Sequence, residues 1–176
     1  MRKIKDFLKA NKHKKILIVP VGVPGAGKST LFENLSKDFD IKKVSYDDIR
    51  INFYRNLHPL DKRSNREIYK DAYLFTSKEK LNLKKEAKKQ IKEAKENIIY
   101  LDNTNLTRKS RRPFLLEFSD FIKAGVYFDV PVEKCIERQF YPDRDKFVSP
   151  KVIYQHYQIL EPPQIGEFDI VFKVKT

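Results

Sequence analysis

Cysteine, glycine and tryptophan are scarce in this chain: its 176 residues include one Cys, five Gly and no Trp. The single cysteine, Cys135, excludes an intrachain disulfide framework and a multi-cysteine metal site. The three histidines at positions 13, 58 and 156 are scattered and predict no metal site. No apolar stretch approaches the roughly 20 residues of a membrane span, and the charged first 15 residues lack a signal peptide's apolar segment. We therefore expect no membrane contact and a cytoplasmic location.

Acidic residues are outnumbered, because 37 Lys and Arg against 24 Asp and Glu give a formal net charge of +13. The excess is concentrated in three segments. Residues 1–15 hold seven basic residues against one acidic residue, residues 78–97 hold eight lysines against four glutamates, and residues 108–112 contain four basic residues. Clustered positive charge suits a polyanionic partner such as nucleic acid. The alternative is that these segments are ordinary solvated faces.

Apolar runs and amphipathic stretches alternate along the chain. We expect strands at 16–21, 42–46, 98–102, 126–130 and 169–174, and helices at 4–8, 29–37, 113–123 (closed by Gly125), 132–140 and 151–160. A short helix should follow Asp47, and residues 64–97 should form two helices or one long, bent helix. This alternation predicts an α/β fold in which a parallel sheet of about five strands is covered by helices on both faces.

The alternation also predicts where a ligand would bind. In parallel sheets, ligands bind beyond the carboxyl ends of the strands, which here means residues 22–29, 47–50, 102–105 and 131 onward. The length suits one domain over residues 1–176, with a basic N-terminal helix or extension at 1–15 and a lid loop at 142–150.

The most specific motif is GlyValProGlyAlaGlyLysSer at residues 22–29, which satisfies the phosphate-loop pattern between a predicted strand and a predicted helix. Backbone N–H groups and a helix N-terminus would surround a phosphate there. Lys28 would bridge the outer phosphates, and Ser29 would ligate Mg²⁺. The predicted ATP-binding residues of this loop are Gly22, Gly25, Ala26, Gly27, Lys28, Ser29 and Thr30. The guanine-reading Asn-Lys-x-Asp signature does not follow, which favours ATP.

Acidic side chains follow the second expected strand. Asp47 would face the outermost phosphate across the crevice and could accept the proton of an attacking hydroxyl. Arg50, one helical turn on, could hold an acceptor phosphate by a forked contact, and Asp48 is a further candidate for binding the acceptor. The alternative is that Asp47 or Asp48 merely caps the following helix.

A second polar cluster, Asp102-Asn103-Thr104-Asn105, follows the third expected strand. An aspartate at this position commonly supports Mg²⁺, which makes Asp102 a candidate metal-site residue. Thr104 and Asn105 could reach a phosphate or the acceptor. The alternative is an N-cap before the Arg-rich segment.

Taken together, these residues resemble the 5′-kinase domain of the phage and animal polynucleotide kinases. The resemblance covers nearly the whole chain and depends on GVPGAGKST, SYDDIR, DNTN and FDVPVEKCIERQ. It implies a P-loop NTPase kinase fold with a helical lid, ATP as donor, Mg²⁺ as cofactor, and a nucleic acid with a 5′-hydroxyl end as acceptor. It also implies Asp47 as general base and Arg50 and Thr104 as acceptor contacts. Arg144, or the preceding Arg138, would be the lid arginine that contacts the phosphates of ATP.

Two other functions remain open from the sequence. One is a P-loop kinase acting on a nucleoside, nucleotide or nucleotide-sugar, and the other is a nucleic-acid-binding ATPase without transfer activity. Neither a phosphatase Asp-x-Asp-Gly-Thr motif nor a ligase Lys-x-Asp-Gly motif occurs, so we expect a stand-alone kinase. Aromatic and basic residues of segment 53–73 could line the acceptor route, or they could simply pack together.

Overall fold

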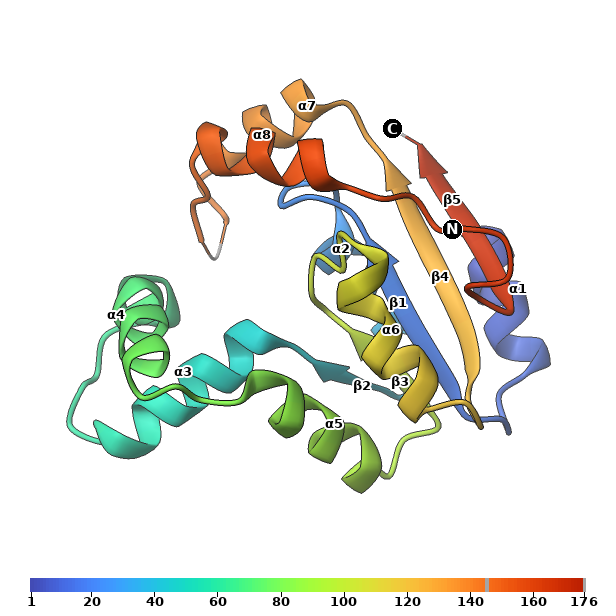
Figure 1. Ribbon diagram of the computed structural model, residues 1–176, viewed down its shortest axis with the longest axis horizontal. Coiled ribbons are helices and arrows are strands. Elements are labelled where there is room, and N and C mark those ends of the chain that lie inside the picture. The colour runs from blue at the N-terminus through green and yellow to red at the C-terminus, as the bar shows by residue number, and fades with distance from the viewer. Residues whose placement is uncertain (145, 176) are drawn as a thin grey trace.

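The computed structural model describes residues 1–144 and 146–175, and Figure 1 shows their arrangement. The strands are β1 (Ile16–Val21), β2 (Ile41–Val44), β3 (Ile98–Leu101), β4 (Ile122–Asp129) and β5 (Ile170–Lys175). The helices are α1 (Arg2–Ala10), α2 (Lys28–Ser36), α3 (Tyr46–Leu57), α4 (Asn65–Lys78), α5 (Leu83–Glu93), α6 (Arg108–Glu117), α7 (Val132–Glu137), the 3₁₀ helix η1 (Arg138–Phe140) and α8 (Pro150–Ile159). Strands and helices alternate, as the sequence predicts.

The five strands form one parallel sheet in the order β2-β3-β1-β4-β5. Leu17 of β1 pairs with Ile99 of β3 on one side and with Lys123 of β4 on the other. The chain leaves β1 toward β2 and β3 and later crosses to β4 and β5, so the direction of winding reverses at the central strand. Ligands of such sheets bind beyond the carboxyl ends of the strands at this reversal, where the loop after β1 lies.

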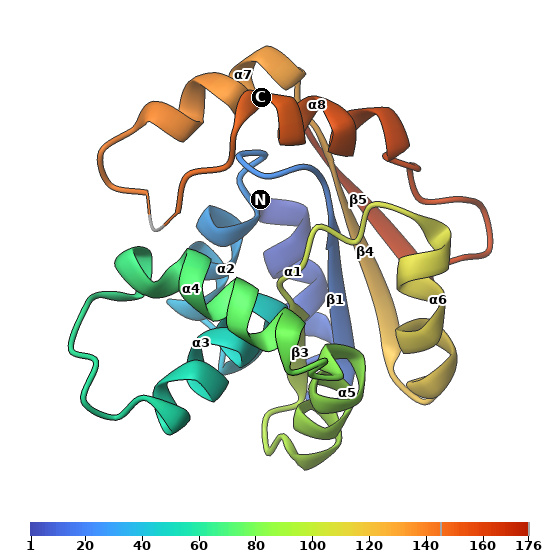
Figure 2. The same ribbon diagram turned by 60° about the vertical axis from the view of Figure 1, so that its left-hand side comes forward.

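Both faces of the sheet are covered by apolar packing. Side chains alternate along β1, so that Ile16 and Ile18 join one core and Leu17 and Val19 join the other. The first core includes residues of α1, α2 and α8, and the second includes residues of α3, α5 and α6, a layering that can be followed in Figure 2. The predicted three-layer α/β fold is therefore confirmed.

A smaller third cluster joins α3 to α4 through Tyr54, Ile68 and Ala72. These two helices extend away from the sheet on the side of β2 (Figure 1). The cluster also settles part of the question about the aromatic segment. Tyr54 stacks on His58 with ring centroids 4.1 Å apart, and both contact Phe75, so these two side chains pack together.

Several predicted boundaries were wrong, among them that of the fourth strand, which spans Ile122–Asp129 and not 126–130. The second strand stops at Val44 because Ser45 caps α3 by accepting a hydrogen bond from the Asp48 N–H, which places Asp47 in the first helical turn. The helix expected at 113–123 spans Arg108–Glu117 instead, starting from a capping box at Thr107.

Gly125 closes no helix, because it lies inside β4. The aromatic ring of Phe168 covers it so closely that an added Cβ would lie 3.0 Å from that ring. Segment 64–97 forms two helices, and Lys80, with a φ of 52°, lies between them. Among residues 1–144 and 146–175, no helix combines the length and the apolar composition that crossing a membrane requires.

Candidate functional site

The loop between β1 and α2 has a backbone that only glycine tolerates at two positions. Gly25 and Gly27 have φ values of 87° and 108°, in the left-handed region. A Cβ at Gly25 would also lie 2.4 Å from the carbonyl oxygen of Cys135 in α7. The N–H of Gly22 donates to the carbonyl of Thr104 at 3.1 Å, which ties this loop to the one after β3. The loop is thus wrapped tightly around the start of α2.

Lys28, the first residue of α2, is buried beneath this loop. Its ammonium donates to the carbonyls of Gly22 and Val23, each at 2.8 Å. Burial lowers the pKa of Lys28 to about 8, although the nearby Asp102 carboxylate opposes the shift. A polyphosphate bound here would give this ammonium an anionic partner in addition to the two carbonyls.

Ser29 and Thr30 follow in the first turn of α2 and are exposed, so their hydroxyls are open to a ligand. Asp102 lies just beyond β3, where burial raises the pKa of its carboxyl while Lys28 opposes the rise. Within residues 1–144 and 146–175, no three His, Cys, Asp or Glu side chains gather into a metal-binding group. Ser29 and Asp102 nevertheless fit Mg²⁺, which is usually held by one or two protein ligands together with substrate phosphates and water.

The second group of site residues surrounds Asp47. Its Oδ1 accepts from the guanidinium of Arg50 at 3.2 Å and from the hydroxyl of Tyr69 at 3.3 Å. Its Oδ2 accepts from the ammonium of Lys146. The carboxylate is 26% exposed, so it is reachable from solvent although it is surrounded by donors. Helices α3 and α4 and the loop before α8 therefore meet at one carboxylate.

The neighbours of Asp47 on α3 are also placed by specific contacts. Arg50 stacks over the ring of Tyr73, with its guanidinium carbon 4.7 Å from the ring centroid. Asp48 forms an ion pair with Lys43 at 2.9 Å and is about half exposed. Arg50 thus presents a guanidinium fixed between a carboxylate and an aromatic ring, which is a suitable arrangement for holding an anion.

Asn105 does not face the acceptor side. It has a φ of 49° and is 5% exposed, and its Nδ2 donates to the carbonyls of Pro20, Leu101 and Asn103. Its amide therefore has a structural role in place of the predicted acceptor contact: the bond to Pro20 holds the loop after β3 against β1, and the other two stabilise the turn itself. Thr104 beside it remains half-buried next to the phosphate loop.

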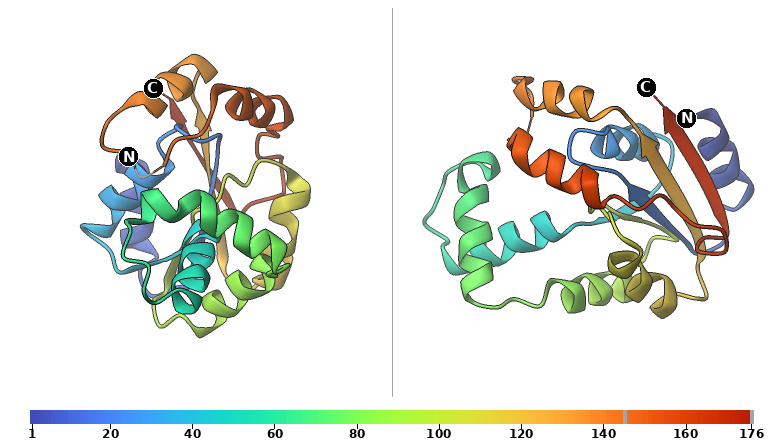
Figure 3. Two further views of the ribbon diagram at one scale, coloured as in Figure 1. Left: turned by 90° about the vertical axis from the view of Figure 1, so that its left-hand side faces the viewer. Right: turned by 45° about the horizontal axis from the view of Figure 1, so that its top comes forward.

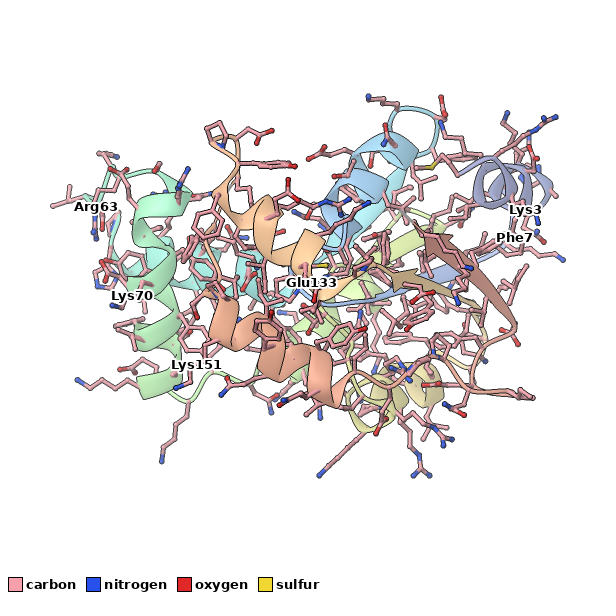
Figure 4. The ribbon with its side chains drawn as sticks, turned by 90° about the horizontal axis from the view of Figure 1, so that it is seen from above. Lys3, Phe7, Arg63, Lys70, Glu133 and Lys151 are labelled. Atoms are coloured by element: carbon pink, nitrogen blue, oxygen red, sulfur yellow. The ribbon has the colours of Figure 1, made fainter. Side chains whose placement is uncertain are left out.

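We refer to α7, η1 and α8, with the described residues 141–144 and 146–149 between them, as the lid segment. In Figure 3 these elements lie over the carboxyl ends of the strands. From above, they lie between α4, which carries Lys70, and α1, which carries Lys3 (Figure 4). Arg138 donates to the carbonyl of Gly25 at 2.9 Å, so it contacts the phosphate loop directly. Arg144 donates to the carbonyl of Lys146 at 3.3 Å and is close enough to Lys28 to lower its pKa.

Sequence reasoning missed Lys146 altogether and gave Tyr69 no specific role. Lys146 lies 99 positions from Asp47 in the sequence, and no motif marks it. The sequence also predicted too much surface charge for residues 108–112, because Arg111 is fully buried and paired with Glu167. Arg108, Lys109 and Arg112 are the exposed cations of that segment.

A family model described as an AAA domain matches residues 17–144, which include the phosphate loop, Asp47 and both lid arginines. This chain belongs to that AAA domain family. The match spans the sheet from β1 through β4, together with α2–α7. A comparison with curated proteins finds no match.

Solved structures with other functions share the fold of this AAA domain. It is similar to a gluconokinase from Sinorhizobium meliloti 1021 (TM-score 0.59, 14% identity, 92% of this chain and 82% of that one). A chain of the Pnkp1/Rnl/Hen1 RNA repair complex gives a TM-score of 0.55 at 22% identity, over 86% of this chain but only 46% of its own length. Kti12 of Chaetomium thermophilum, in complex with ADP-AlF3, gives 0.53 at 16% identity, over 90% and 88%. At these identities the likeness shows the fold, which is the P-loop NTPase kinase fold.

Proposed function

We propose that this AAA domain is an ATP-dependent polynucleotide kinase that transfers the γ-phosphate of ATP to a 5′-hydroxyl end of RNA or DNA. The observation that supports it most is the position of Asp47, which lies beyond β2, partly exposed, with Arg50 and Tyr69 bonded to one of its oxygens. A carboxylate positioned in this way suits a general base, and the fixed guanidinium beside it suits the terminal phosphate of an acceptor.

The proposed reaction is a direct transfer. The acceptor hydroxyl loses its proton to Asp47 as its oxygen forms a bond to the γ-phosphorus, and the bond from that phosphorus to the bridging oxygen breaks, releasing ADP. Lys28 holds the outer phosphates, while Arg138 and Arg144 approach them from the lid. Mg²⁺, held by Ser29 and Asp102, would neutralise phosphate charge. Positioning and charge neutralisation supply most of the rate in such reactions.

A nucleic acid acceptor is supported by the surface charge. The lysines of α5 and the exposed cations of α1 and α6 give basic surfaces outside the nucleotide site. Tyr73 is 47% exposed beside Arg50, so an end nucleotide could stack there. The likeness to a chain of an RNA repair complex is compatible with this acceptor class. A single kinase domain over residues 1–176, with residues 142–150 as its lid loop, is part of the same proposal.

A small-molecule kinase is the second candidate, because the gluconokinase is also structurally similar. One assay separates the candidates: γ-labelled ATP and Mg²⁺ are offered with 5′-hydroxyl RNA, 5′-hydroxyl DNA, nucleosides, nucleoside monophosphates and gluconate in parallel. We expect label on the nucleic acids. If label appears only on small acceptors, the proposed polynucleotide acceptor is wrong and the protein is a small-molecule kinase. Release of free phosphate without any labelled acceptor would indicate an ATPase.

Binding of a 5′-hydroxyl oligonucleotide should weaken steeply with salt. Each phosphate neutralised by Lys or Arg releases a counterion, so three or more contacts imply a loss of affinity of about tenfold or more between about 50 and 200 mM salt. Fluorescence anisotropy with a labelled single strand measures this slope. An affinity that does not change with salt would mean that the basic surfaces do not bind the acceptor.

Nucleotide affinity should fall at alkaline pH because of Lys28. Its pKa of about 8 lies below the ordinary 10.5, so the ligand-free protein loses this proton near pH 8. A bound triphosphate favours the ammonium, so binding above pH 8 must take up a proton and should weaken by up to about tenfold per pH unit. Calorimetry in buffers of different ionisation enthalpy detects this uptake. In Lys28→Arg the cation stays charged, so any nucleotide binding should lose this pH dependence.

A further inference from the structure

One contact crosses from the lid to the opposite side of the site. The ammonium of Lys146, in the loop before α8, bonds to Oδ2 of Asp47 at the start of α3. It also lies over the ring of Tyr69 on α4, 5.2 Å from the ring centroid. The lid loop has a second contact with α4, because Arg66 donates to the carbonyl of Pro142 at 3.4 Å. The lid is therefore held against α3 and α4 at the proposed base.

The charges around Lys146 place it between the two halves of the site. Burial opposes its charge, but Asp47 and Tyr69 prevail, with support from Asp102, and raise its pKa above the ordinary value. The same ammonium is one of the charges that lower the pKa of Lys28. Its bond to Asp47 and its place over the ring of Tyr69 put this ammonium at the proposed base, on the side of the lid.

Both carboxylate oxygens of Asp47 already accept hydrogen bonds. Oδ1 accepts from Arg50 and Tyr69, and Oδ2 accepts from Lys146. A general base must receive the acceptor's proton on one of these oxygens. Since Arg50 and Tyr69 both lie on the helices that carry the acceptor side, Oδ2 is the oxygen that a lid movement can release. Lys146 must leave it before an acceptor hydroxyl takes its place.

We propose that Lys146 is a further phosphate-binding residue that exchanges partners: it holds Asp47 in the ligand-free protein and moves to the outermost phosphate when ATP binds. The triphosphate carries more negative charge than one carboxylate, so it offers the ammonium a stronger partner. The exchange frees Asp47 only when ATP is bound. Without ATP, Lys146 occupies the oxygen that the acceptor hydroxyl needs, so less acceptor binds to protein that has no phosphate to transfer. This inference rests on the proposed donor and base roles, but not on the identity of the acceptor.

A double-mutant cycle without any acceptor tests the exchange. The four proteins are wild type, Asp47→Asn, Lys146→Met and the double variant, and the measurement is calorimetric affinity for Mg²⁺ with AMP-PNP or with ADP. Lys146→Met should weaken AMP-PNP binding about tenfold and leave ADP binding within about twofold. Asp47→Asn should tighten AMP-PNP binding about fivefold when Lys146 is present, because the lysine no longer has to leave a carboxylate, and by less than about twofold in the Lys146→Met background.

Two further variants make the result specific. Lys146→Arg keeps the cation and should restore part of the preference for AMP-PNP over ADP. Lys173→Met breaks a more exposed ion pair, with Asp129, outside the proposed site, and should change neither affinity. Equal effects of Asp47→Asn in both backgrounds, or equal weakening of AMP-PNP and ADP in Lys146→Met, would overturn the exchange. Because these binding measurements contain no acceptor, they test the exchange independently of the labelling assay. A failure to label polynucleotides would contradict the proposed acceptor and leave the exchange to be decided by the cycle.

Discussion

Replacing Asp47 with asparagine is expected to lower the turnover number for phosphate transfer by about 10²-fold or more, with nucleotide still bound. The amide keeps the size of the carboxylate, and its oxygen can still accept from Arg50 and Tyr69. It cannot take the proton of the acceptor hydroxyl. Single-turnover transfer to a 5′-hydroxyl oligonucleotide at saturating ATP measures the chemical step, and calorimetry with AMP-PNP shows that the donor site remains intact.

Two other aspartates make this prediction specific. Asp48→Asn removes the neighbouring carboxylate, which is paired with Lys43 and not with the donors around Asp47, so its loss of turnover should be much smaller. Asp38→Asn changes an exposed carboxylate that pairs with Lys5 and should leave turnover within about twofold. Near-normal turnover in Asp47→Asn, or a larger loss in Asp48→Asn, would reassign the base.

The parts of the fold that sequence predicted best are those that local chemistry specifies. The phosphate loop is one, because glycine spacing, an apolar strand before it and an amphipathic helix after it all agree. The α3 boundary was shifted because Ser45 was counted in the strand, whereas its side chain caps the helix. The N-terminal part of β4 was missed because its strand character depends on β1 and on Phe168, which covers Gly125 from elsewhere in the chain.

The site shows the same limit. Asp47 and Arg50 were predicted because they are close in sequence and follow a strand. Tyr69 and Lys146 come to Asp47 from 22 and 99 positions away, and only the packing of α4 and the lid brings them there. Asn105 was given a ligand role because of its residue type, but its positive φ and buried amide assign it to the backbone of the loop. Residue type predicts possible chemistry, and packing decides which groups remain open to a ligand.

Arg111 was predicted to be a surface cation, yet it lies at the centre of a buried polar network. Its side chain is fully buried and forms a two-point contact with Glu167 at 2.6 and 3.0 Å. Its Nη1 also donates to the carbonyls of Asn105, Leu106 and Glu161. This arginine connects α6 to the loop after β3 and to the segment before β5. It therefore stabilises the loop that carries Asp102 and Thr104.

Arg111→Met is expected to lower the free energy of unfolding by about 3–5 kcal/mol, because it leaves the nearly buried Glu167 carboxylate without its cation. Urea denaturation followed by circular dichroism measures the change, and an unaltered m-value checks that the comparison is valid. Lys92→Met is the matched control: it breaks the exposed pair with Glu117 and should cost no more than about 1 kcal/mol.

The double variant Arg111→Met with Glu167→Gln separates the charge from the packing. Removing the stranded carboxylate should recover about 1–3 kcal/mol of the loss. The remaining deficit belongs to the three carbonyls that lose their donor. A cost for Arg111→Met no larger than for Lys92→Met would mean that solvent reaches Glu167 and that Asn105, together with the hydrogen bond from Gly22 to Thr104, holds the loop after β3. In that case the position of Asp102 relative to Lys28 would depend on the amide of Asn105, and Asn105→Ala, not Arg111→Met, would be the variant that displaces it.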